Sequence, residues 1–187
     1  PDLQEIDEVI PLEPADRAAY AQAPMHLMQK RLAATVGAGG QQAAQYDRLR
    51  ELLAQYREEG RKVVLFSFFK ENLRLIQKEA SKFTKSVLFT GDMNAEEKDK
   101  SKVQFSSDPA TRLFLSSDAG GYGVDLPMAN YLISYDLPWS SGKLEQREAR
   151  IIRLSSEFSH VTVATFVMQG SIEERQYEML RQKKSIN

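Results

Sequence analysis

Hydrophobic and polar residues follow two alternating patterns along this chain. Between residues 45 and 60, apolar side chains recur every three or four positions and Gly60 follows them, which predicts an amphipathic helix. Compact apolar runs, typical of buried strands, then alternate with helical stretches. We expect strands at 63–68, 86–89, 113–115, 131–135 and 161–167, and helices at 73–83, 94–105, 143–153 and 171–184. Asn94 with Glu97 three residues later is a capping-box start for the second of these helices.

The order of these elements predicts the fold class. Strands that alternate with helices of about 10 to 15 residues form parallel sheets, because parallel neighbours need a crossover connection. Such crossovers cover the sheet with helices. We therefore expect an α/β protein whose core is an open parallel sheet flanked by helices on both faces.

The first 44 residues follow a different pattern. Residues 1–35 are rich in Ala, Met, Leu and Gln and contain three prolines, which predicts short helices at 15–22 and 25–34. Glycines between residues 37 and 40 then interrupt the pattern. We expect a small N-terminal helical appendage and linker at 1–44, and one larger domain at 45–187.

Composition narrows the classes of function. The absence of cysteine excludes disulfides and cysteine-ligated zinc, and two histidines are too few for a convincing metal site. A formal net charge of −1 argues against bulk attraction to nucleic acid, so any such contact has to be local. No apolar run approaches the roughly 20 residues of a membrane span. We expect an intracellular protein with no metal site of its own.

A glycine-rich segment follows the predicted strand at 113–115. Gly120, Gly121 and Gly123 permit the close backbone approach that a phosphate or nucleotide requires. Asp125 is suited to accept hydrogen bonds from ribose hydroxyls. A flexible surface loop with an aspartate turn residue accounts for the segment equally well, so the pattern alone leaves both interpretations open.

Gln146, Arg150 and Arg153 share one face of the predicted helix at 143–153, because they lie at positions i, i+4 and i+7. Two guanidinium groups on one face suit the oxygens of a transferring phosphoryl group. The alternative is a solvated face that pairs with neighbouring glutamates, and the isolated pattern favours that alternative.

Four segments carry a wider resemblance. They are the strand and loop Val63 to Phe69, the glycine-rich Ser117 to Leu126, the turn Asp136 to Trp139 and the helix Gln146 to Arg153. In this order they resemble motif IV, motif V, the Asp-x-x-Trp turn and motif VI in the C-terminal lobe of superfamily-two helicase-like ATPases of the SWI/SNF type. The resemblance covers about residues 45–180 and implies a RecA-like lobe of an ATP-dependent DNA translocase.

The resemblance also implies roles for single residues. Arg150 and Arg153 look like paired arginine fingers, with Gln146 ordering the site. The implied nucleotide contacts are Asp125, Gly121 and Gly123. The implied nucleic-acid contacts are Ser67, Phe68, Lys70, Thr90, Ser117 and Trp139. A tryptophan after a strand is also commonly a half-buried packing residue, which leaves a second interpretation of Trp139.

The sequence departs from the family pattern around the expected arginine fingers. Ala149 stands where a glycine is usual before the first finger, and Leu154 to Ser156 replace a usual x-Gly-Gln sequence. Ser140 and Ser141 replace a usual Asn-Pro. The fingers are retained while their surroundings are altered.

The sequence contains no Gly-x-x-x-x-Gly-Lys-Ser/Thr phosphate loop and no acidic metal-positioning motif. We therefore expect ATP with Mg²⁺ as the cofactor of a parent enzyme whose magnesium ligands lie on a separate N-terminal RecA-like lobe. This chain alone is expected to be a monomer without ATPase activity, with double-stranded DNA and that lobe as partners and no contact with a membrane. It would be cytoplasmic or nucleoid-associated in a prokaryote or virus, and nuclear in a eukaryote.

Two alternatives stay open. A RecA-like lobe of this kind is also compatible with a non-catalytic protein-interaction module, in which residues 15–34 are partner helices. An RNA helicase lobe shares the general layout of the motifs. The Asp-Leu-Pro-Trp turn and the Gly-Ser-Ile-Glu-Glu sequence at 170–174, which is similar to a closing pattern of the SWI/SNF-type family, favour DNA translocation.

Overall fold

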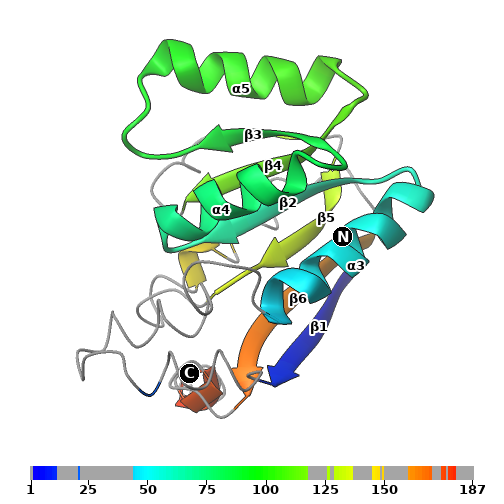
Figure 1. The fold of residues 1–187 in the computed structure, drawn as a ribbon, viewed down its shortest axis with the longest axis vertical. Coiled ribbons are helices and arrows are strands. Elements are labelled where there is room, and N and C mark those ends of the chain that lie inside the picture. The colour runs from blue at the N-terminus through cyan, green and yellow to red at the C-terminus, as the bar shows by residue number, and fades with distance from the viewer. Residues whose placement is uncertain are drawn as a thin grey trace.

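The computed structural model describes residues 2–11, 21, 44–117, 126, 129–136, 145–147, 149, 160–169, 174, 175 and 177–179. Its strands are β1 (Asp2–Pro11), β2 (Lys62–Ser67), β3 (Lys85–Phe89), β4 (Thr111–Ser117), β5 (Ala129–Ser134) and β6 (His160–Gln169). They form one sheet in the order β1-β6-β5-β2-β4-β3, and each pair of neighbours is parallel. The predicted parallel α/β sheet is confirmed, and Figure 1 shows β1 and β3 at its two borders.

Within the described residues, three helices lie between these strands. They are α3 (Ala44–Glu58), α4 (Lys70–Ala80) and α5 (Ala95–Ser107), and α4 begins and ends three residues before the range predicted at 73–83. Gly60 adopts a φ of +71° just after α3, a conformation that favours glycine, and the Arg61 amide donates to the Tyr56 carbonyl at 2.9 Å. At the start of α5, the Glu97 amide donates to the Asn94 side chain at 2.8 Å, and the Asn94 amide donates to the Glu97 carboxylate at 3.1 Å. The predicted capping box is therefore confirmed.

Helices cover both faces of the sheet. On one face, apolar side chains of α3 and α4 such as Leu49 and Leu73 pack on Leu65 and Leu115, which are fully buried. Figure 1 shows α3 and α4 along the same side of the sheet. On the opposite face, Phe105 of α5 packs on alternate side chains of the same strands. Because β2 and β4 are buried on both faces, their sequences are continuous apolar runs and do not alternate between apolar and polar residues.

The N-terminal segment requires a correction. We expected residues 1–44 to form a helical appendage and linker, whereas residues 2–11 form β1 and pair with β6 along its whole length, from Asp2 opposite His160 to Pro11 opposite Gln169. β1 is thus a border strand of the main sheet. The predicted helices at 15–22 and 25–34 lie, apart from Ala21, outside the described residues.

The two predicted C-terminal helices are described in part. Residues 145–147 and 149 are helical within the range predicted at 143–153, and residues 174, 175 and 177–179 are helical within the range predicted at 171–184. Among the described residues, no helix has the length and apolar character needed to cross a membrane.

Candidate functional site

Hydroxyl side chains mark the carboxyl ends of four adjacent strands. Ser67 ends β2 and pairs with Ser117 at the end of β4, while Ser134 ends β5 beside Phe66. Thr90 follows directly after β3, on the far side of β4. All four hydroxyl-bearing residues are buried. Ligands of open parallel sheets bind along this edge, so the structure brings three predicted contacts, Ser67, Thr90 and Ser117, to the edge where a site is expected.

Asp136 is the centre of a buried network at this edge. It is 1% exposed and lies two residues beyond β5. Its carboxylate accepts a hydrogen bond from the Phe68 amide at 2.6 Å, another from the Asn72 side chain at 3.1 Å, and a third from the Ser67 hydroxyl. The end of β5 is thereby tied to the turn between β2 and α4. These contacts give Ser67 and the Phe68 backbone a structural role, and their contact with DNA stays a prediction.

Arg147 joins the helical residues at 145–149 to the same network. Its side chain is 1% exposed, and its guanidinium lies 3.8 Å from the Asp136 carboxylate. It also donates to the Ser134 hydroxyl at 2.6 Å and to the Asp136 carbonyl, and it lies over the Phe66 ring at 6.0 Å from the centroid. A buried guanidinium requires such a set of partners, because its desolvation is otherwise costly. The helix is therefore fixed to the carboxyl edge of the sheet through a side chain that faces inward.

The predicted arginine fingers and Gln146 belong to the same segment of the sequence as Arg147. Gln146 is exposed beside the buried Arg147, which fits its assignment to a face that looks away from the core. Arg150 and Arg153 lie outside the described residues, as do the predicted contacts Asp125, Gly121, Gly123 and Trp139.

Lys70 and Thr90, two predicted contacts with DNA phosphates, meet at Asp92. The Lys70 amine lies 3.5 Å from the Asp92 carboxylate, and the Thr90 hydroxyl donates to the same carboxylate. The pKa of Asp92 lies below its usual value, because of the Thr90 hydrogen bond first, then a backbone hydrogen bond and the charge of Lys70. Both members of the ion pair are about half exposed. This pair places a carboxylate beside a surface lysine, and the contact of Lys70 and Thr90 with DNA stays a prediction.

Sequence reasoning missed the most strongly held side chains of the site. It assigned no role to Arg147, Asn72 or Asp92, and it named Asp136 only as part of a turn. A signal for Arg147 exists in hindsight, because it lies three and four residues from Leu144 and Ile151 and so takes a core-facing position of the helix. Its partner Asp136 could not be identified in this way, because the contact depends on the packing of the helix against β5.

Comparisons with known proteins identify the family of the chain. Residues 44–155 match the family model described as the helicase conserved C-terminal domain. The ATP-dependent helicase fft3 of Schizosaccharomyces pombe is 34% identical over 134 residues, which cover 71% of this chain and 14% of that helicase. The chain spans a similarly small part of other curated relatives that it matches.

Solved structures show the same fold. The C-terminal part of the Fun30 ATPase domain matches 96% of this chain and 89% of its own length, with a TM-score of 0.81 and 16% identity. The Sulfolobus solfataricus SWI2/SNF2 ATPase core in complex with double-stranded DNA matches all of this chain and 45% of its own length, with a TM-score of 0.83 and 22% identity. The chain therefore belongs to the helicase conserved C-terminal domain family and has the fold of the C-terminal lobe of SWI2/SNF2 ATPases.

Proposed function

We propose that this chain is the second motor lobe of an ATP-dependent DNA translocase and contributes half of an ATP site and half of a DNA site. The family and the fold support this assignment. The observation that carries it is the attachment of the motif VI helix to the carboxyl edge through Arg147 and Asp136. A catalytic arginine has to be held within a fraction of an ångström of its productive position, and a buried ion pair on the same helix supports that rigidity.

In this proposal Arg150 and Arg153 reach across an interlobe cleft to the phosphates of ATP. Their charge would stabilise the phosphoryl group in transfer, with Gln146 ordering the site. The nucleotide contacts would come from Asp125 and the glycine-rich segment that follows β4. Mg²⁺ and its ligands would belong to the N-terminal lobe, so that this chain alone does not hydrolyse ATP.

Contacts with double-stranded DNA would come from the same edge of the sheet. The dsDNA complex of the Sulfolobus solfataricus ATPase core, which has this fold, supports the choice of nucleic acid. Lys70 is exposed enough to exchange its partner, and a DNA phosphate would take the place of Asp92. Contacts with backbone phosphates do not depend on the base sequence, and the binding affinity falls as the salt concentration rises.

The test uses the parent enzyme with both lobes. Arg150→Ala and Arg153→Ala are each expected to lower DNA-stimulated kcat by about a thousandfold, because an arginine finger supplies stabilisation of this order. Arg74→Ala is the matched control, since it removes an exposed arginine of α4 and should leave kcat unchanged. Full activity in both finger variants, or ATP hydrolysis by the 187-residue chain alone, would refute the assignment.

The same assay separates the alternatives. Stimulation by double-stranded DNA above that by single-stranded DNA and RNA is the expected result for a DNA translocase. Preferential stimulation by RNA would indicate an RNA helicase lobe. No stimulation by any nucleic acid would favour a non-catalytic interaction module.

A further inference from the structure

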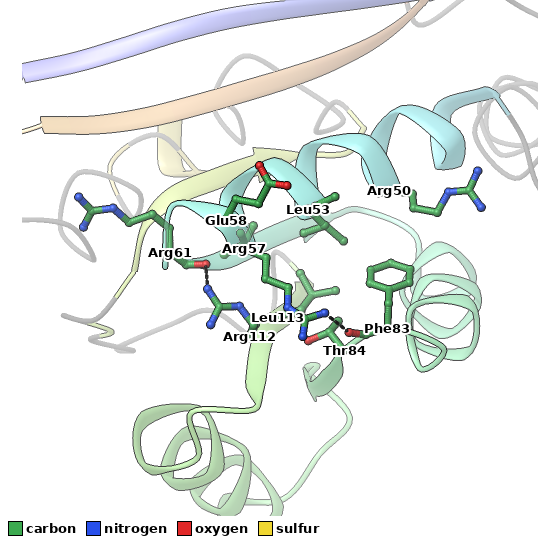
Figure 2. Close-up of a pocket in the computed structure, with 11 residues that line it drawn as sticks. Arg50, Leu53, Arg57, Glu58, Arg61, Phe83, Thr84, Arg112 and Leu113 are labelled. Carbon is green, nitrogen blue, oxygen red and sulfur yellow. Dashed lines mark hydrogen bonds between the residues drawn. The ribbon is translucent and has the colours of Figure 1, made fainter.

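A second site lies at the opposite edge of the sheet from the network of Asp136. A pocket of about 560 Å³ opens between the C-terminal half of α3 and the amino ends of β2 and β4 (Figure 2). Its apolar lining includes Leu53 of α3, Val63 of β2, Leu113 of β4 and Phe83, which follows α4. Its size and lining are typical of a ligand-binding pocket.

Arginines surround this apolar floor. Arg50, Arg57, Arg61 and Arg112 all line the pocket, against one carboxylate in the lining, that of Glu58. Figure 2 shows Arg50 and Arg61 at opposite ends, and Arg57 and Arg112 between them. The chain as a whole carries a net charge of −1, so this concentration of positive charge is local.

Backbone carbonyls hold two of these guanidinium groups in place. Arg57 donates to the Phe83 carbonyl at 3.3 Å, and Arg112 donates to the Arg61 carbonyl at 2.9 Å (Figure 2). A carbonyl orients a guanidinium without neutralising it. Arg50 has a single, long contact of 3.7 Å with Asp47, and both of these side chains are about half exposed. The rim therefore keeps most of its positive charge available to an incoming anion.

The spacing of the arginines indicates the shape of the ligand. Arg50 and Arg57 lie seven residues apart on one face of α3, which corresponds to roughly 10 Å along the helix. A single phosphate or a small carboxylate does not span this distance, whereas an extended peptide of about four residues does. The apolar floor has no counterpart in a nucleic-acid backbone, and it suits one aliphatic or aromatic side chain of such a peptide.

We propose that this pocket binds an acidic peptide segment of a partner protein, with carboxylates on the arginine rim and one large apolar residue on the floor. The proposal is independent of the proposed motor function. It assigns a protein contact to the amino edge of the sheet, so that binding there leaves the carboxyl edge accessible.

The test measures fluorescence anisotropy of a labelled peptide, Glu-Glu-Leu-Phe-Glu-Glu, with the 187-residue chain. The combined change Arg50→Glu and Arg57→Glu is expected to weaken binding at least about tenfold, because two attractive contacts become repulsive. Arg74→Glu is the matched control, an exposed arginine of α4 outside the pocket, and should change the affinity by less than about twofold. Circular dichroism confirms that each variant is folded.

A second peptide tests whether binding requires the apolar anchor, and a DNA competitor tests whether the pocket binds nucleic acid instead. The peptide Glu-Glu-Ser-Ser-Glu-Glu lacks the apolar anchor and is expected to bind at least about tenfold more weakly, since no large apolar side chain leaves water for the floor of the pocket. Equal binding of both peptides would overturn the proposal in favour of general charge attraction. Displacement of the first peptide by a short DNA duplex, lost in the Arg50 and Arg57 variant, would overturn it in favour of a nucleic-acid site.

Discussion

At the residue scale, the hydrogen bonds and ion pair of Asp136 join the end of β5 to the turn between β2 and α4 and to the helical residues at 145–147. The side chains of Asp136 and Arg147 are almost fully buried, and removing two charges from water costs several kcal/mol each. The Ser134 hydroxyl and the Asn72 amide supply further partners, which reduces this cost. A fully satisfied buried pair contributes little net stability and strongly disfavours other arrangements of the same segments. Its main effect here is to fix geometry.

Removing either Asp136 or Arg147 should therefore lower the free energy of unfolding by far more than the small net contribution of the intact pair. Asp136→Ala leaves the Arg147 guanidinium buried without its carboxylate, and we expect a loss of about 3–5 kcal/mol in the free energy of unfolding. Urea denaturation measures this loss. Asp99→Ala, at an exposed position of α5, is the matched control and should cost less than about 0.5 kcal/mol. A loss below about 1 kcal/mol for Asp136→Ala would contradict the assigned role.

Part of the site was accessible from the sequence. Ser67, Thr90 and Ser117 were predicted from the resemblance to the helicase-like family, and they lie together because parallel strands end at a common edge. The buried ion pair was not predicted, because the spacing of Arg147 from Leu144 and Ile151 indicates a core-facing position without identifying a partner. Only the packing of its helix against β5 brings Arg147 to Asp136.

At the element scale, β1 was not predicted because one inward-facing polar residue interrupts its hydrophobic pattern. Ile10 is buried and Ile6 is partly buried, and Glu8 lies between them in the same alternation. The period of two is therefore interrupted by a carboxylate. Glu8 forms two bonds of 2.9 Å with Arg48 of α3, a partner 40 residues away. The other five strands have apolar runs without such interruption, which is why they were predicted and β1 was not.

This paired contact should hold β1 onto the rest of the domain. Glu8→Gln is expected to cost about 1–2 kcal/mol, because a two-point contact between charged groups is lost at a site that is only 17% exposed on the glutamate side. Hydrogen exchange measured by mass spectrometry should show faster exchange in residues 2–11 than in β2.

The matched control uses the second partner of the same arginine. Glu51 bonds Arg48 at 3.0 Å and its side chain is 66% exposed, so Glu51→Gln should cost less than about 0.5 kcal/mol and leave the exchange of β1 unchanged. Equal effects of the two substitutions would show that the contact with Glu8 does not hold the strand.

At the scale of the whole molecule, the two edges of the sheet have different properties. The carboxyl edge has a closed network of polar groups, and the amino edge has an open pocket with a charged rim. The helices between them pack on both faces, so unfolding of the sheet exposes both layers together. Groups buried in these layers, such as Tyr56 of α3, therefore influence global stability.

The phenol group of Tyr56 makes the free energy of unfolding decrease at alkaline pH. Burial, followed by the charges of nearby groups, raises the pKa of Tyr56 to about 12, compared with 10.0 in an exposed tyrosine. The folded state therefore holds its proton more tightly than the unfolded state. This contribution is complete below pH 10 and is lost as the pH rises towards 12, with a total of about 3 kcal/mol.

Urea denaturation of the wild type and of Tyr56→Phe at pH 8, 10 and about 11.5 checks this prediction. The variant should lose less stability over this range, because phenylalanine has no proton to release. The pKa values of Tyr46 and Tyr131 are also raised, and both residues are present in the two proteins, so the difference between the curves isolates Tyr56. Parallel curves would contradict the raised pKa.

The pairing of β1 with β6 also has a consequence during synthesis on the ribosome. Asp2 lies opposite His160, so β1 emerges well before β6 and has no partner strand until β6 follows. At roughly 5–20 residues per second this delay is on the order of ten to thirty seconds. An unpaired strand is a template for aggregation, and acidic side chains along it oppose that outcome by mutual repulsion. We expect the acidic side chains of β1 to oppose aggregation of the nascent segment until β6 has been synthesised. They are Asp2, Glu5, Asp7 and Glu8.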